Sequence, residues 1–196
     1  MTGLIDPAGN RTTFAFDAMD RQTSMTDPLN HTGTFAYDLA GRLTSQTDRD
    51  GNVVNSQYDS DNRLTQQVWL SGGVAVNTLA YSYDNNSNLL TAQDSHGAYT
   101  MAYDALDRLT AQQEPFGLAL TMAFDAAGNR SQVQDSFGGT TTSLYDAAHR
   151  LTTREFSTGG ATPLRIDLGY TARDQLTTMT RYSERGQDNR RESRLP

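Results

Sequence analysis

Tyr37-Asp38-Leu39-Ala40-Gly41-Arg42-Leu43-Thr44 is the stretch that decides the fold, because the chain repeats it. Eight copies follow one another, and each begins with an aromatic anchor that is followed in seven of them by an aspartate. Successive anchors are 21, 21, 25, 20, 21, 21 and 25 residues apart. A fixed period in this range indicates a repeat architecture. The structural repeat anchors are Phe16, Asp17, Tyr37, Asp38, Tyr58, Asp59, Tyr83, Asp84, Tyr103, Asp104, Phe124, Asp125, Tyr145, Asp146 and Tyr170.

Each period contains two short runs of β-type residues, such as 32–37 and 42–47 in the second copy. Runs of about six residues have the usual length of strands. Phe35 and Tyr37 are two positions apart and therefore point to the same face of a strand. The other residues two positions before an anchor are Phe14, Ser56, Tyr81, Met101, Met122, Ser143 and Leu168, in which the two serines are exceptions to an apolar pattern. The return strands carry leucine at one matching position: Leu43, Leu64, Leu89, Leu109, Leu151 and Leu176. The pattern predicts stacked hairpins with an aromatic ladder beside a leucine ladder.

Two kinds of turn connect the runs. In the first, the aspartate after the anchor can accept backbone N–H groups as an Asx turn. Three residues after it comes a position that favours a positive φ, occupied by Asp20, Gly41, Asn62, Ser87, Asp107, Gly128, His149 and Asp174. The second turn has the form Asp6-Pro7-Ala8-Gly9-Asn10, which fits β-turn preferences. The two 25-residue periods lengthen this second turn, at 71–73 and 157–160. Arg42 is the least explained member of the repeat, with a neighbouring aspartate as its candidate partner.

The sequence therefore predicts an all-β fold of about eight 21-residue hairpins in one broad, curved, spiralling antiparallel sheet, a partial β-cocoon. About sixteen strands at roughly 4.8 Å spacing make a sheet on the order of 75 Å wide, and sheets of that width twist and curl. The expected division is a repeat array at 1–180 and a polar, arginine-rich, disordered tail at 181–196. Because such a sheet leaves strand edges exposed, we expect self-association through the edges.

Composition narrows the function. The chain has 196 residues, 36% of them hydrophobic, and a formal net charge of −7 from 19 Asp and 4 Glu against 16 Arg without any Lys. An acidic chain with evenly spread charge is a poor ligand for nucleic acids. The chain contains no cysteine, residues 1–30 show no signal-peptide pattern, and no run reaches 18 apolar residues. The sequence therefore predicts neither nucleic-acid binding nor membrane insertion.

The residues that could suggest a metal or catalytic site are explained as ordinary turn residues. Asp48, Asp50 and Asn52 alternate as calcium ligands do, but the position of the EF-hand glycine is filled by Val53. The histidines, His31, His96 and His149, are all at turn positions without metal-ligand spacing. No Gly-x-Ser-x-Gly motif is present, and the carboxylates recur in every repeat rather than forming one tuned pair. We therefore predict no catalytic, cofactor-binding or metal-binding residue, no cofactor and no enzymatic activity.

Trp69, the single tryptophan, lies near the first lengthened turn. Its expected role is packing. Stacking against a sugar ring is the alternative, because an indole presents a large flat apolar surface.

The repeated Tyr-Asp-x-x-Gly-Arg-Leu-Thr, alternating with Asp-Pro-x-Gly-Asn, resembles the YD repeat of RHS proteins over about residues 4–180. The resemblance implies a shell in which the repeats form a long sheet that spirals into a hollow cocoon. In bacterial polymorphic toxins and insecticidal toxin complexes, such a shell encloses a C-terminal toxic domain. Teneurins use a related barrel in cell adhesion, and carbohydrate binding is also proposed for YD repeats.

The sequence departs from full-length members of that family. The core segment with its aspartic self-cleavage site has no counterpart, because Asp6-Pro7-Ala8-Gly9 and Glu114-Pro115-Phe116-Gly117-Leu118 are repeat turns. The leading hypothesis is a non-enzymatic fragment of a larger shell that encloses or presents a toxin domain encoded elsewhere. Its expected partners are the remainder of the shell and the toxin domain, in a bacterial protein that is exported or bound to the cell surface. A surface adhesion or glycan-binding module is the second hypothesis, and a repeat-built hydrolase the third.

Overall fold

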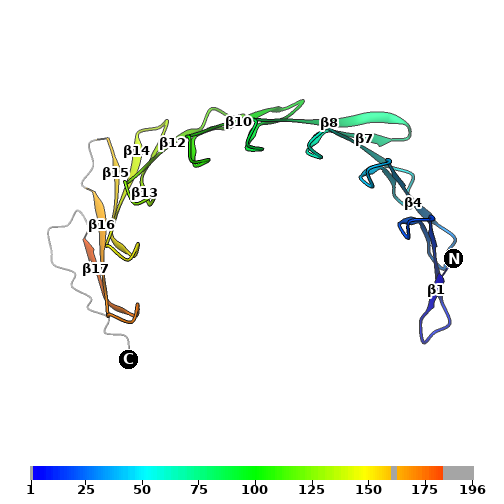
Figure 1. Cartoon of the computed structure of the whole chain (residues 1–196), viewed down its shortest axis with the longest axis horizontal. Helices are drawn as coiled ribbons and strands as arrows, with labels where there is room; N and C mark the ends of the chain where they lie inside the picture. The colour runs from blue at the N-terminus through cyan, green and yellow to red at the C-terminus, as the bar shows by residue number, and fades with distance from the viewer. Residues whose placement is uncertain (1, 160–162, 183–196) are drawn as a thin grey trace. The chain divides into compact units, whose positions relative to one another are not determined.

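The computed structural model describes residues 2–159 and 163–182, and this part of the chain is all-β (Figure 1). It contains 17 strands in antiparallel pairing and no helix. The prediction of an all-β array of antiparallel hairpins is therefore confirmed. Within the described residues, no helix has the length and apolar character needed to cross a membrane.

The chain divides into two compact units, Met1–Ala98 and Tyr99–Pro196. The strands of the first unit are β1 (Thr2–Ile5), β2 (Arg11–Phe16), β3 (Gln22–Thr26), β4 (Thr32–Tyr37), β5 (Leu43–Thr47), β6 (Val53–Tyr58), β7 (Leu64–Ser71), β8 (Val74–Tyr83) and β9 (Leu89–Asp94). β10 (Gly97–Tyr103) spans the division. The second unit continues with β11 (Leu109–Gln113), β12 (Ala119–Phe124), β13 (Arg130–Asp135), β14 (Gly139–Tyr145), β15 (Leu151–Thr158), β16 (Leu164–Tyr170) and β17 (Leu176–Tyr182). Of the disordered tail expected at 181–196, Arg181 and Tyr182 instead belong to β17 and pair with Ile166 and Arg165 on β16, and residues 183–196 lie outside the described residues.

The two faces of each sheet differ in chemistry. In the first unit the register aligns Phe14 with Met25 on one face, which we name the anchor face because the anchors follow on it. On the opposite face, the threonine face, Thr13 aligns with Thr26 and Thr26 with Thr32. The Oγ1 atoms of Thr26 and Thr32 are 2.8 Å apart, which is hydrogen-bond distance. Alternation of side chains along each strand therefore separates larger apolar residues from small hydroxylated ones.

Each Tyr-Asp hairpin shifts its register by one residue at the anchor. In the second repeat, Ala36 pairs with Ser45 but Tyr37 pairs with Leu43, and the same irregularity recurs at all eight anchors. A bulge bends a strand and increases its local twist. Within each unit the Tyr-Asp turns fold over the same face of the sheet (Figure 1).

The two serines that interrupt the apolar pattern belong to the hairpins with lengthened second turns. Ser56 pairs with Gln67, and Ser143 pairs with Arg154. In both pairs the long side chain donates a hydrogen bond of 3.4 Å to the serine Oγ. Ser143 is only 6% exposed. A long polar side chain thus covers the space that a large apolar residue occupies in the other repeats.

No hydrophobic side chain among the described residues is fully buried. A single-layer sheet has solvent on both faces and cannot form the thick core of a two-layer domain. Cross-strand pairs and the contacts between neighbouring turns therefore carry the stability of this fold.

Candidate functional site at the linked Tyr-Asp turns

The aspartate of each Tyr-Asp turn holds the turn closed. Asp59 Oδ1 accepts hydrogen bonds from the backbone N–H groups of Asp61 and Arg63, both at 2.9 Å. The same two-residue and four-residue spacing is made by Asp17, Asp84, Asp104, Asp125 and Asp146. In the eighth repeat the hydroxyl of Thr171 accepts the equivalent N–H groups at 3.2 Å. The aspartates are therefore occupied as backbone acceptors, as an Asx turn requires.

The position three residues after this aspartate has a positive φ in all eight repeats. The residues are Asp20, Gly41, Asn62, Ser87, Asp107, Gly128, His149 and Asp174, with φ between 57° and 88°. This left-handed conformation is strained for most side chains and tolerated by Gly, Asn and Asp. The sequence prediction for this position is therefore confirmed, including for Ser87, whose type does not favour it.

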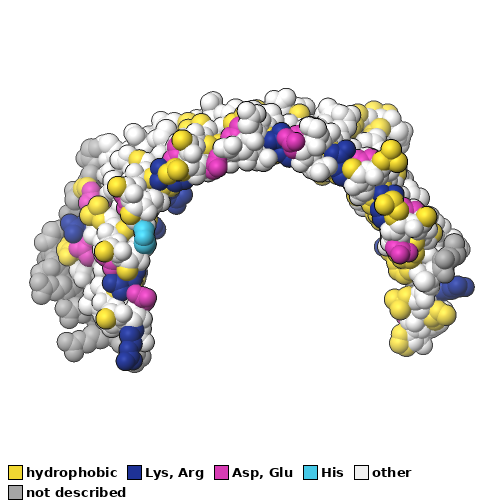
Figure 2. All heavy atoms as spheres, in the orientation of Figure 1, with side chains coloured by type: hydrophobic (Ala, Val, Ile, Leu, Met, Phe, Trp, Pro, Cys, Tyr) yellow, Lys and Arg dark blue, Asp and Glu magenta, His cyan; other side chains and the backbone are white. Residues whose placement is uncertain are grey.

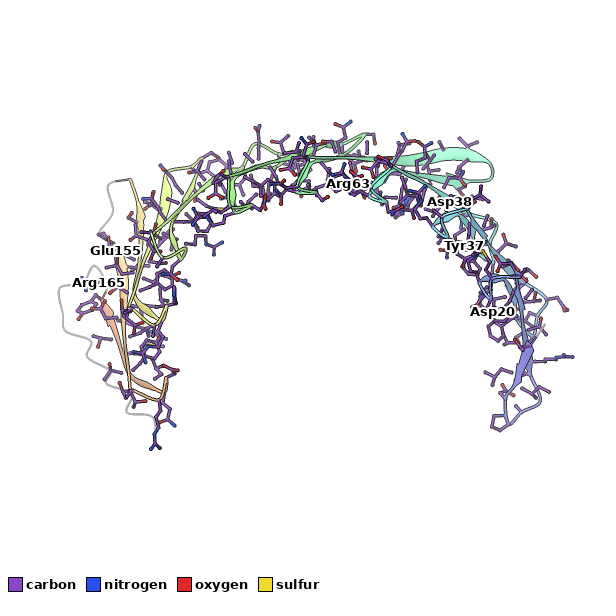
Figure 3. The ribbon with its side chains drawn as sticks, viewed as in Figure 1. Asp20, Tyr37, Asp38, Arg63, Glu155 and Arg165 are labelled. Carbon is purple, nitrogen blue, oxygen red and sulfur yellow. The ribbon has the colours of Figure 1, made fainter. Side chains whose placement is uncertain are left out.

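The arginine that follows connects one repeat to the next. Arg63 Nε donates to Asp59 Oδ2 at 2.7 Å inside its own turn. Its Nη1 donates to the backbone carbonyl of Asp84 at 2.7 Å, and its guanidinium lies 5.0 Å from the ring centroid of Tyr83. Arg63 thus bridges two turns with a charge-assisted hydrogen bond and a cation–π contact. Figure 3 shows Arg63 on the same side of the first unit as Tyr37 and Asp38.

The bridge recurs wherever the repeat has arginine. Each such guanidinium lies 4.4–5.0 Å from the ring centroid of the next anchor, in the pairs Arg21–Tyr37, Arg42–Tyr58, Arg63–Tyr83, Arg108–Phe124 and Arg150–Tyr170. Nη1 also reaches the positive-φ residue of the next repeat at Asn62, Ser87 and Asp174. Alternating dark blue and magenta side chains mark these turns in each unit (Figure 2).

The hydroxyl of the anchor tyrosine makes a second link, in the opposite direction along the chain. Tyr58 Oη donates to the carbonyl of Leu43 at 2.9 Å, at the beginning of the previous return strand. Equivalent bonds of 2.8–3.2 Å join Tyr37 to Gln22, Tyr83 to Leu64, Tyr145 to Arg130 and Tyr170 to Leu151. Phenylalanine at Phe16 and Phe124 has no hydroxyl with which to make this bond.

Where asparagine replaces arginine, the link changes. Asn129 Nδ2 donates to Asp125 at 2.9 Å within its turn, and its Oδ1 lies 2.8 Å from Nδ1 of His149 in the next repeat. His149 is the positive-φ residue of that repeat. Asn129 is shorter than the arginine of other repeats, and the longer side chain of His149 on the neighbouring turn reaches back to it.

These contacts favour the ionised carboxylates. The backbone N–H of Arg42 and then its guanidinium hold the pKa of Asp38 below its ordinary value. The side chain of Arg108 acts in the same direction on the pKa of Asp104, and the side chain of Arg150 on the pKa of Asp146. Desolvation raises the pKa of Tyr83. The turn carboxylates are thus held in the form that accepts hydrogen bonds, rather than poised to exchange a proton.

The second-turn carboxylates that suggested a metal site serve the backbone instead. Asp48 Oδ1 accepts the N–H groups of Asp50 and Asn52, and its Oδ2 accepts the Asn52 side chain, all at 2.9 Å. In the part of the chain that the structure describes, no three acidic, histidine or cysteine side chains come together as a group that could hold a metal ion.

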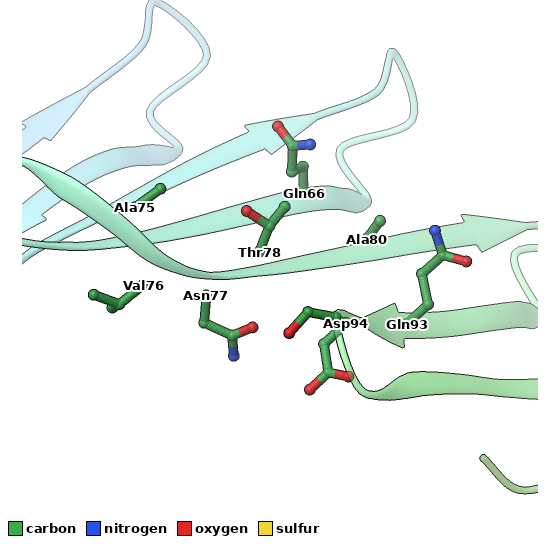
Figure 4. Close-up of a pocket in the computed structure, with 9 residues that line it drawn as sticks. Gln66, Ala75, Val76, Asn77, Thr78, Ala80, Gln93 and Asp94 are labelled. Carbon is green, nitrogen blue, oxygen red and sulfur yellow. The ribbon is translucent and has the colours of Figure 1, made fainter.

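One open cleft of about 460 Å³ lies in the first unit beside β8 (Figure 4). Its lining includes Gln66, Asn77, Gln93 and a single carboxylate, Asp94. Asp94 is itself the acceptor of two backbone N–H groups in the β9–β10 turn. The cleft therefore lacks the converging pair of carboxylates that glycoside hydrolysis requires.

The arginine bridge is the feature that the sequence pattern did not reveal. The pattern suggested a neighbouring aspartate, and Arg42 does pair with Asp38, but it also contacts Tyr58 sixteen residues later. The spacing in the sequence could have indicated this contact. Each repeat arginine precedes the next anchor by 16 residues where the period is 21, and by 20 residues where the period is 25. The structure brings six of the anchors into contact with a neighbouring repeat, and these are Tyr37, Tyr58, Tyr83, Phe124, Tyr145 and Tyr170.

Comparisons with known proteins agree with this geometry. The model of the teneurin YD-shell family matches residues 10–136. A crystal structure of TcdB2-TccC3 without its hypervariable C-terminal region is similar with a TM-score of 0.64 and 14% identity, over 94% of this chain and 11% of that one. A Tc holotoxin pore from Photorhabdus luminescens gives a TM-score of 0.43 and 14% identity, over 87% of this chain and 13% of the other. The chain thus spans a small part of either structure, and no curated protein matches it. Since the family match covers most of the sequence, the chain belongs to the teneurin YD-shell family.

Proposed function

We propose that the chain is a non-enzymatic structural segment of an RHS-type shell that encloses or presents a toxin domain encoded elsewhere. The observation that carries the proposal is that the polar residues of the repeat bind the backbone of the turns and link neighbouring turns. Asp59 closes its own turn, and Arg63 bridges that turn to the next one. Because these carboxylate and guanidinium groups already bind the backbone and the neighbouring repeat, they are not free to act as a catalytic pair. We therefore assign the repeat anchors a structural role.

The single-layer sheet supports the same proposal. With no fully buried hydrophobic side chain among the described residues, the fold suits a wall better than a compact enzyme domain. The partners that we propose are further strands of the shell and an enclosed toxin domain. The similar crystal structure likewise joins two named components, TcdB2 and TccC3. We further propose that the repeat array is one domain that extends through β17, that a separate tail follows it, and that the protein acts outside the bacterial cytoplasm.

The experiment begins with the coding DNA. Reading it past Pro196, in every frame, identifies any core or toxin-like segment, and the longest product is then expressed and treated with protease. The proposal expects a downstream domain that resists digestion while the shell is intact and becomes sensitive when Arg42 and Arg63 are both replaced by alanine. A downstream domain digested at the same rate in both proteins contradicts enclosure. Finding no downstream segment contradicts the toxin partner.

A glycan-binding module is the second candidate, favoured by one specific pair. Trp69 is 44% exposed and lies directly across from Asn77, whose buried Oδ1 has no hydrogen-bond partner. The exposed indole can stack on a sugar ring, and the Asn77 amide, once its side chain turns outward, can accept a hydrogen bond from one of the ring's hydroxyls. This candidate expects sugar binding, measured on a glycan array, that Trp69→Ala abolishes and Tyr182→Ala leaves unchanged.

A further inference from the structure

The hairpin of β7 and β8 is longer than its neighbours and leaves one edge of β8 open. The pairing of β8 with β9 runs from Tyr83 to Ala80, which faces Gln93, and β9 ends at Asp94. Within the described residues, the segment from Val74 to Leu79 therefore has no ladder partner on that side. The cleft of about 460 Å³ lies along this segment, as Figure 4 shows, where β8 extends beyond the end of β9.

The open segment lacks the usual protection of an edge. Native proteins cover exposed edges or place lysine, other charges or proline on them. The chain contains no charged residue from Leu64 to Tyr83, and the nearest charges are Arg63 and Asp84. Val74 and Val76 are 67% and 62% exposed. Figure 2 shows hydrophobic side chains gathered at the end of this hairpin.

The absence of charge also indicates what can cover the edge. A partner recognised by opposite charge would find nothing to pair with between Leu64 and Tyr83. The formal net charge of −7 makes two copies of the chain repel each other, and this repulsion is least where neutral surfaces meet. A second copy presents an edge of the same length, without charge and with the same β-branched side chains.

We propose that residues 74–76 of two copies pair antiparallel, edge to edge, in a two-fold symmetric dimer. In such an isologous interface, every contact away from the two-fold axis occurs twice, once from each copy. The space available sets the register: Asp94 and Ser95 close one end of the cleft. A partner strand fits when Ala75 of one copy is opposite Ala75 of the other and Val74 is opposite Val76, so that the Val76 side chains of both copies lie on the same face of the paired strands. In that register the Gly72-Gly73 turn of each copy lies against the Asp94-Ser95 turn of the other.

Sedimentation analysis of the 196-residue chain over a range of concentrations tests the dimer. The wild-type chain is expected to show a monomer–dimer equilibrium, and Val76→Lys to raise the dissociation constant by about tenfold or more, because two like charges then meet across the paired strands. Leu4→Lys is the matched control, since Leu4, on β1, is an apolar residue that is 67% exposed and so about as accessible as Val76. Circular dichroism verifies that both variants keep the β structure.

A second readout uses the absence of cysteine from the chain. Val76→Cys is expected to cross-link into dimers with a short bifunctional maleimide, and Leu29→Cys, in an exposed turn, is not. This readout does not require the lysine variant to fold. A wild-type chain that stays monomeric contradicts the proposal. So does a dimer that Leu4→Lys disrupts while Val76→Lys leaves it intact, or equal cross-linking at both cysteines.

Discussion

The hydroxyl of the anchor tyrosine makes a sharp test of the link between repeats, because the chain itself contains both versions of the anchor. Tyr58 donates to the carbonyl of Leu43 at 2.9 Å, whereas Phe124 occupies the same position in its repeat without a hydroxyl. Replacing Tyr58 by phenylalanine removes one hydrogen bond and keeps the ring that Arg42 contacts. A half-buried neutral hydrogen bond contributes about 0.5–1.5 kcal/mol net, so we expect Tyr58→Phe to lower the free energy of unfolding by about 1 kcal/mol.

The reverse substitution is expected to have the opposite sign. In Phe124→Tyr, the new hydroxyl is placed to reach the carbonyl of Leu109, fifteen residues earlier, as Tyr58 reaches Leu43. We expect a gain of about 0.5–1 kcal/mol, or roughly 1–4 °C in melting temperature for a chain of this size.

Urea unfolding measures both changes. Trp69 is the single tryptophan and pairs with Val54 on β6, so its fluorescence follows the strand that ends in Tyr58. Circular dichroism follows the change at Phe124. Tyr81→Phe is the control, because no hydrogen bond from the Tyr81 hydroxyl is found within the described residues. The reasoning is refuted if Tyr58→Phe shifts the midpoint no more than Tyr81→Phe does, while Phe124→Tyr lowers stability.

Three further perturbations test the turns. Ser87 has a φ of 69°, so Ser87→Gly is expected to stabilise the first unit by about 0.5–1 kcal/mol in urea unfolding, and a loss of stability would contradict the strain argument. Arg63→Ala is expected to lower the melting temperature and Arg63→Lys to restore little of it, because an ammonium cannot reach Asp59 Oδ2 and the Asp84 carbonyl with the same planar fork; full rescue by lysine would show that charge alone matters. The pKa values of turn carboxylates such as Asp59 are lowered in the folded state, which therefore binds fewer protons than the unfolded state at acidic pH. The free energy of unfolding is expected to be constant above about pH 5 and to fall as the pH drops below about 4. A melting temperature that rises between pH 4 and pH 3 would contradict this assignment.

The fold could be predicted because each local signal in the sequence agrees with the others. Gly41 and Asn62 mark the positive-φ position by residue type, and the period carries the assignment to Ser87, whose type does not. Phe35 and Tyr37 define one face by simple alternation. Strand geometry depends on such short-range patterns, which a single sequence contains in full.

The inter-repeat contacts were harder to predict, since they depend on how far a side chain reaches across a bulged hairpin. Arg42 lies next to Asp38 in its own turn, and nothing in the local sequence shows that its Nη1 also reaches the carbonyl of Asp59. The open edge of β8 was likewise not predictable, because the position where β9 stops pairing is set by the lengths of two neighbouring hairpins. Both features arise between repeats rather than within one.

The central claim is that the repeat arginine, wherever it is present, couples its Tyr-Asp turn to the next one as part of a structural wall. A double-mutant cycle between Arg63 and Tyr83 measures this most directly, with unfolding of Arg63→Ala, Tyr83→Ala and the double variant followed in urea. We expect the double variant to lose clearly less stability than the sum of the single losses, since the two residues stabilise one shared contact. Single losses that add without any coupling, in a chain that keeps its β structure, would contradict the account.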